Sequence, residues 1–203
     1  LFDVDEDGNA LSIGYRVDFG NGDTIEIGPF EDFFTGIELI GYDLTGNGVN
    51  EIVYCGSHGG STFPPEGSEI AVFAKTDAGY EMLLLPRFDD WEIDASPYAT
   101  GFSIYSKDVT ETSATLYSPQ YGYEESIGID QNAYEYCFKE TGNEPVGSQA
   151  WRVAVDTVEG VPALVLYVNI GSKYYERNLM VHLTWQDGVY KPVNMGLEPL
   201  RGE

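Results

Sequence analysis

The segment with the clearest potential chemistry is GYDLTGNGVNEIVYCG, residues 41–56. It contains oxygen-bearing side chains at Asp43, Thr45, Asn47 and Glu51. Glycines at positions 46 and 48 allow the backbone to turn sharply, so that the carbonyl of Val49 can face the inside of the loop. Ca²⁺ binds oxygens that a short loop presents in this way. The spacing therefore predicts a calcium loop with Asp43, Thr45, Asn47, Val49 and Glu51 as ligands.

Only two of these ligands, Asp43 and Glu51, carry a carboxylate. Calcium affinity falls with the number of charged ligands, and extracellular modules bind at about 10⁻⁴ to 10⁻³ M. We therefore expect the loop to fill outside a cell and to stay empty in cytosol. A second interpretation stays open, in which Asp43 and Asn47 bond to their own backbone in a tight turn without a metal.

The charge of the chain restricts its partners. Of its 203 residues, 34 are acidic and 10 are basic, which gives a net charge of -24. This charge repels phosphate backbones, so we expect no nucleic-acid partner. No apolar run approaches the roughly 20 residues that cross a bilayer, so we expect no membrane insertion of this segment. An acidic surface that only maintains solubility explains the charge equally well.

Alternating apolar and polar residues, separated by turn dipeptides, predict a mainly β protein with little helix. Turn signals include Asp7-Gly8, Asn21-Gly22, Glu159-Gly160 and Asp187-Gly188. We expect one short helix within the segment 131–149, a short helical turn at most within residues 29–36, and no long amphipathic helix.

The chain also contains an internal repeat. Residues 150–195 follow the pattern of strands and turns of residues 37–85, and Asp156 falls where Asp43 does. The other ligand positions are lost, because Val158 and Ala163 replace Thr45 and Glu51. We therefore expect the second copy to fold like the first and to bind no metal.

This repeat predicts a single β-rich domain over residues 1–203, built from two related antiparallel meander units. Residues 86–149 lie between the units and are expected to supply further strands and loops. Two blades cannot close a propeller, which needs about four to eight. The units are therefore expected to pack either like propeller blades, together with the intervening strands, or face to face as a sandwich.

The run D-L-T-G-N-G-V-N-E-I-V-Y, with the hairpin ending D-A-G-Y, resembles the FG-GAP/VCBS repeat, the calcium-loop unit of integrin-α-like β-propellers. The resemblance is greatest to the form in surface or lipid-anchored proteins of Gram-positive bacteria. It covers residues 37–85 well and 150–195 weakly. It implies the same five ligands, although the neutral Thr45 and Asn47 depart from a fully acidic loop.

The resemblance further implies an extracellular or cell-surface location and a non-enzymatic role in recognition or structure, with a protein or glycan as partner. The chain begins at Leu1, inside a predicted strand, and contains no signal peptide. We therefore expect an export signal to have been removed.

Two alternative functions follow from other residues. A carbohydrate-binding module would use exposed Tyr and Trp rings, among which five tyrosines are closely spaced: Tyr117, Tyr121, Tyr123, Tyr134 and Tyr136. A hydrolase would need a nucleophile and base, or a carboxylate pair. The candidates for the hydrolase are His58 beside Ser57 and Ser61, the acids Asp89, Asp90, Glu92 and Asp94 around Trp91, and the pair Glu124 and Glu125.

Each hydrolase candidate has a simpler explanation. An exposed loop histidine and a solvated acidic loop are both commoner than a catalytic site, and the sequence lacks the G-x-S-x-G elbow. We therefore expect no enzyme activity.

His182 alternates with apolar residues and is expected to face solvent or a polar partner. Cys55 and Cys137 form either one disulfide or two buried thiols.

Overall fold

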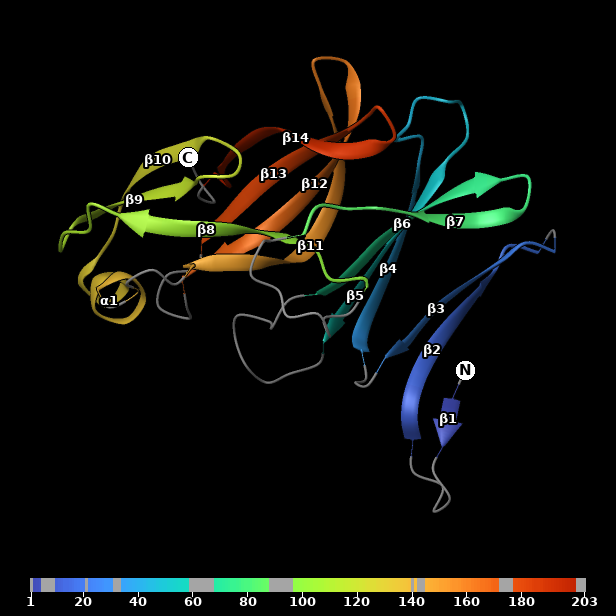
Figure 1. Cartoon of the computed structure of the whole chain (residues 1–203). Coiled ribbons are helices and arrows are strands. Elements are labelled where there is room, and N and C mark those ends of the chain that lie inside the picture. The colour runs from blue at the N-terminus through green and yellow to red at the C-terminus, as the bar shows by residue number, and fades with distance from the viewer. Residues whose placement is uncertain are drawn as a thin grey trace.

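The computed structural model describes residues 2–4, 10–20, 22–30, 34–58, 68–87, 97–139, 141, 145–171 and 177–199. These residues form three antiparallel sheets and a short helical segment (Figure 1). The prediction of a mainly β protein with little helix is therefore confirmed.

The first sheet has three strands in the order β1 (Phe2–Val4), β2 (Ala10–Asp18) and β3 (Thr24–Phe30). The second has four strands in the order β4 (Phe34–Tyr42), β5 (Glu51–His58), β6 (Ser68–Thr76) and β7 (Gly79–Leu83). Both are meanders, in which each strand pairs with the next one along the chain.

The third sheet has seven strands and curls into a nearly closed barrel (Figure 1). Its first three strands are β8 (Gly101–Lys107), β9 (Ser113–Ser118) and β10 (Tyr123–Gly128). Its last four are β11 (Gly147–Val158), β12 (Val161–Ile170), β13 (Arg177–Gln186) and β14 (Val189–Leu197). Pairing of β8 with β11 joins the two groups, so the strand order is β10-β9-β8-β11-β12-β13-β14.

A short helical segment links β10 to β11. It consists of α1 (Gln131–Ala133) and a π-helical turn, η1 (Tyr134–Phe138). Asp130 caps its start, because Oδ1 accepts a hydrogen bond from the backbone N–H of Ala133 at 2.8 Å. This is the position where the sequence predicts one short helix.

The two central strands of the four-stranded sheet, β5 and β6, are buried on both faces. Val53 and Cys55 of β5 pack into a large core with the seven-stranded sheet. Tyr54, between them in the sequence, packs instead with Ile25 and Ile27 of β3 in a second core. Successive strand residues point to opposite faces, so this sheet is the middle layer of the molecule.

Both segments of the internal repeat form four-strand meanders, β4–β7 and β11–β14. Hairpin turns of type I′, which require positive φ at both central residues, occur where the sequence predicts turns. Glu159 and Gly160 have φ of 51° and 83°, and Asp187 and Gly188 have φ of 54° and 84°. The turn Asp7-Gly8 lies outside the described residues, as does Asn21 of the turn Asn21-Gly22.

Cys55 and Cys137 are both buried free thiols, which decides between the two states open from the sequence.

Among the helical residues that the structure describes, none belongs to a helix of the length and hydrophobicity that a bilayer crossing requires.

Candidate functional site

The predicted calcium loop connects β4 to β5. Tyr42 and Glu51 are paired across the two strands, so the chain returns directly beside the point where it left the sheet. Gly46 and Gly48 have φ of 73° and 83°, in the left-handed region that glycine adopts without strain. The two glycines therefore make the reversal that the sequence predicts.

The first half of the loop is held by side-chain bonds to its own backbone. Asp43 Oδ1 accepts from the N–H of Asn47 at 3.0 Å, and Oδ2 accepts from the N–H of Gly48 at 2.9 Å. Asn47 Oδ1 in turn accepts from the N–H of Val49 at 2.7 Å. These are the turn bonds of the metal-free interpretation, although each oxygen keeps a further lone pair that a cation can use.

The second half of the loop is organised around the carboxylate of Glu51, which is only 1% exposed. Oε2 accepts from the N–H groups of Leu44 and Thr45 at 2.7 and 3.0 Å. Oε1 accepts from the Thr45 hydroxyl at 2.9 Å. The loop thus brings the side chains of Thr45 and Glu51 together. The side chains of Asp43 and Asn47 instead bond to the backbone of residues 47–49. The side chain of Val49 is exposed.

Glu51 lies close to the C-terminal hairpin. Burial raises the pKa of Tyr190 on β14 well above its ordinary range, and the negative charge of Glu51 raises it further. The Tyr190 hydroxyl is buried and has no hydrogen-bond partner among the described residues. No local pattern in the sequence connects Tyr190 to the loop, because the two meet only through the packing of separate sheets.

The loop contributes two carboxylates and no histidine or cysteine. Within the described part of the chain, no group of three or more His, Cys, Asp or Glu side chains gathers around a common point. A cation held here would depend mainly on neutral oxygens, as the composition of the loop predicts.

The second copy of the repeat differs from the first at the corresponding loop. β11 continues to Val158, and the two-residue turn Glu159-Gly160 replaces the loop. Asp156 lies within this strand, with Oδ2 at 3.6 Å from Nε2 of His182. The expectation that the two copies fold alike is therefore wrong at the loop, because a tight hairpin leaves no room for a curled segment.

His182 is 8% exposed and contacts a polar partner, Asp156. Its Nδ1 is buried without a hydrogen bond to any described residue. Solvent exposure, the other environment expected for this histidine, is not observed.

The hydrolase candidates do not assemble into a described site. His58 ends β5, but its side chain lies outside the described residues, as do Ser61 and the acidic segment 89–94. Glu124 pairs with Lys107 at 2.6 Å, whereas Glu125 accepts from the Tyr123 hydroxyl at 2.8 Å. These two glutamates are neighbours on β10 and therefore point to opposite faces of the sheet.

The five tyrosines are divided among several environments. Tyr117 packs against its cross-strand partner Tyr105, with ring centroids 5.6 Å apart. Tyr134 and Tyr136 lie on η1, where Tyr136 is 63% exposed. Tyr121 and Tyr123 line a common hollow.

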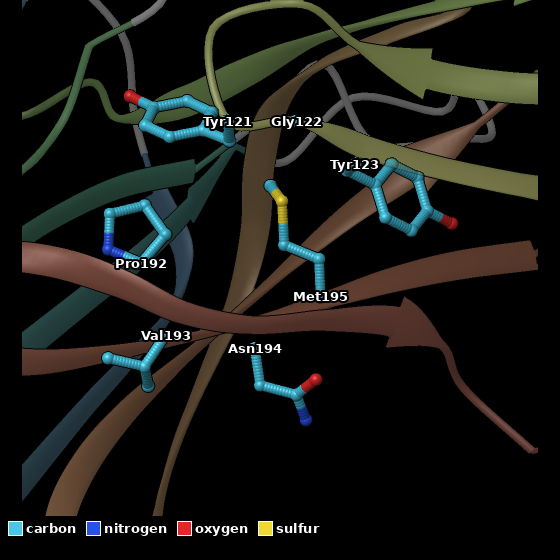
Figure 2. Close-up of a pocket in the computed structure, with 7 residues that line it drawn as sticks. All are labelled: Tyr121, Gly122, Tyr123, Pro192, Val193, Asn194 and Met195. Atoms are coloured by element: carbon cyan, nitrogen blue, oxygen red, sulfur yellow. The ribbon is translucent and has the colours of Figure 1, made fainter.

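This hollow is a second candidate site (Figure 2). It has a volume of about 260 Å³ and is lined by Tyr121, Gly122, Tyr123, Pro192, Val193, Asn194 and Met195. The sequence draws attention to its tyrosines but not to the β14 residues, because only the curvature of the seven-stranded sheet brings its two edges together.

No family model, curated protein or solved structure matches the chain.

Proposed function

We propose that the chain is a non-enzymatic secreted or cell-surface module, with a recognition or structural role, in which one calcium ion stabilises the loop between β4 and β5. The observation that supports this proposal is the burial of the Glu51 carboxylate. A buried carboxylate is costly unless hydrogen bonds and an opposite charge compensate it, and Glu51 has three hydrogen bonds. None of the ion pairs among the described residues includes Glu51.

The oxygens of the loop are suited to a hard cation. Three acceptor positions of Glu51 and two of Asp43 are used by hydrogen bonds, out of about four that each carboxylate offers. Thr45 donates its hydroxyl proton to Glu51, which leaves the lone pairs of Oγ1 available. Together with Asn47 Oδ1 and the Val49 carbonyl, these oxygens approach the six to eight ligands that Ca²⁺ takes, and water supplies the rest.

Calcium titration of the EDTA-treated protein by calorimetry tests the proposal. We expect one site with a Kd of about 10⁻⁴ to 10⁻³ M, as in extracellular modules of this kind. At ten times the Kd, binding stabilises the folded state by about 1.4 kcal/mol, which raises the melting temperature.

Two matched substitutions make the test specific. Asp43→Asn removes one ligand charge and should weaken binding, whereas Asp156→Asn changes the corresponding aspartate of the second copy and should not. Absence of heat at millimolar calcium in the unchanged protein would contradict the proposal, as would equal weakening by the two substitutions.

A further inference from the structure

The seven-stranded sheet fails to close between β10 and β14, and the hollow lies at this opening. Its lining comes from the turn before β10 and the start of that strand, and from the middle of β14. In Figure 2, Met195 points from β14 toward the space between Tyr121 and Tyr123, whereas Asn194 points the other way. The hollow is therefore walled by side chains from both edges of the sheet.

The β14 edge is poorly suited to pairing with an added strand. The register of β14 against β13 shifts between Asn194 and Pro192, so that Val193 is an extra residue in a bulge. Proline has no N–H to donate to a neighbouring strand. A proline and a bulge on an edge strand are the features that prevent strand addition, so an extended peptide is not the occupant that this surface favours.

The chemistry of the walls favours a neutral ligand. The lining contains two phenol rings, a proline ring and a thioether, but no acidic or basic side chain. The net charge of -24 repels anions from the surface as a whole. At the bulge, Val193 has no partner residue on β13, and the extra residue of a bulge leaves its backbone polar groups outside the ladder.

Both tyrosines are held in place by contacts outside the hollow. The Tyr121 ring packs edge-on against Phe102, with centroids 5.1 Å apart. Tyr123 donates its hydroxyl hydrogen bond to Glu125 at 2.8 Å. Because the rings are fixed before binding, a ligand loses little free energy in ordering them.

We propose that this hollow binds a neutral saccharide, with the C–H faces of the sugar against Tyr121 and Tyr123 and its hydroxyl groups bonded to the bulged backbone of β14. The volume of about 260 Å³ lies just below the usual range of ligand pockets, about 300–1,000 Å³, so the hollow suits a small ligand unit such as one sugar ring. The inference rests on the recognition role proposed above but does not require calcium.

Methionine methyl groups provide a direct probe. The chain contains three methionines, and Met195 lines the hollow, whereas Met82 lies on β7 and Met180 on β13. We would label the methyl groups with ¹³C and titrate cellotetraose and chitotetraose, as representative neutral oligosaccharides, once in EDTA and once in calcium. The expected result is a saturable shift of the Met195 signal in both conditions, with Met82 and Met180 unchanged.

The absence of a Met195 shift with both cellotetraose and chitotetraose at millimolar concentration would overturn the proposal. Because the titration is also made in EDTA, a failure of calcium binding is seen separately from a failure of sugar binding.

Substitutions locate the site independently. Tyr123→Ala should abolish the Met195 shift, whereas Tyr123→Phe keeps the ring and should retain it. Tyr136→Ala removes an exposed tyrosine on η1 and serves as the matched control. Retention of full sugar affinity by a folded Tyr123→Ala protein would contradict the assignment. If that variant does not fold, the titration of the Met195 signal in the unchanged protein remains the test.

Discussion

The Thr45 hydroxyl donates a 2.9 Å hydrogen bond to Oε1 of Glu51, while the backbone N–H of the same threonine reaches Oε2 at 3.0 Å. One carboxylate at the first residue of β5 therefore binds both the side chain and the backbone of a residue at the other end of the loop. The loop is closed by Glu51 even before any cation is considered.

Glu51→Ala should destabilise the protein in EDTA by about 2–4 kcal/mol, because one buried donor on Leu44 and two partly buried donors on Thr45 lose their acceptor at once. Urea denaturation measures the change. Glu81→Ala, which removes an exposed glutamate from β7, is the control and should cost less than about 0.5 kcal/mol. A Glu51→Ala protein as stable as the control would mean that the carboxylate does not hold the loop.

The junction of β8 with β11 depends on a glycine. A Cβ at Gly101 would lie 2.0 Å from the carbonyl oxygen of Ser148, a backbone atom that cannot move without disturbing β11. Gly101→Ala should therefore cost more than about 3 kcal/mol or prevent folding. Gly128→Ala on β10, where nothing lies within 4 Å, is the matched control and should be tolerated. Thermal melting distinguishes the two, and equal stability would contradict the close approach of β8 and β11.

Cys55 should react slowly with thiol reagents. Burial raises the pKa of Cys55 from 9.0 to about 11, so the reactive thiolate at pH 8 is about 100-fold rarer than for a thiol at the ordinary value. Iodoacetamide labelling followed by mass spectrometry measures this, with the urea-unfolded chain as control. Equal labelling rates for the folded and unfolded chains would contradict the burial of the thiol.

The same shift makes the protein sensitive to alkali. The folded state holds the Cys55 proton more tightly than the unfolded state does, so the stability from this thiol is complete below pH 9 and decreases between pH 9 and about 11. Burial also raises the pKa of Tyr54 and Tyr190, which adds to the loss above pH 10. Urea denaturation at several pH values should show this decrease, and Cys55→Ala should reduce the part between pH 9 and 10.

Arg152 makes contacts that lysine cannot reproduce. Its guanidinium carbon lies 3.7 Å from the centroid of the Tyr167 ring, and Nη2 bonds to Oε1 of Glu198 at 2.7 Å. Arg152→Lys loses the planar stacking and should cost about 1 kcal/mol, since the side chain is partly exposed. Lys191→Ala, which breaks the exposed pair with Asp187, is the control and should have no measurable effect in urea denaturation.

The local features of the fold are readable in the sequence because neighbouring residues determine them. Glu159-Gly160 and Asp187-Gly188 predict primed turns, since a glycine there relieves the strain of a positive φ. The apolar run Ile52-Val53-Tyr54 predicts a strand. It does not identify what covers the two faces of this strand, because the covering residues come from β3 and from the seven-stranded sheet.

The contacts of the candidate sites likewise divide into those within one loop and those between distant strands. The bond between Thr45 and Glu51 follows from spacing within one loop, whereas the proximity of Tyr190 to Glu51 follows from the packing of two sheets. Met195 meets Tyr121 only because the seven-stranded sheet curls. Alternation assigns a side chain to one face of its strand, but it does not specify which distant strand lies opposite that face.

The middle position of the four-stranded sheet determines how the whole molecule loses its structure. β5 contributes Val53 to one core and Tyr54 to the other, so neither core survives the detachment of this strand. The two meanders resemble a duplication, but they do not behave as independent repeats. Heating should therefore produce a single calorimetric transition, with both halves of the chain melting together.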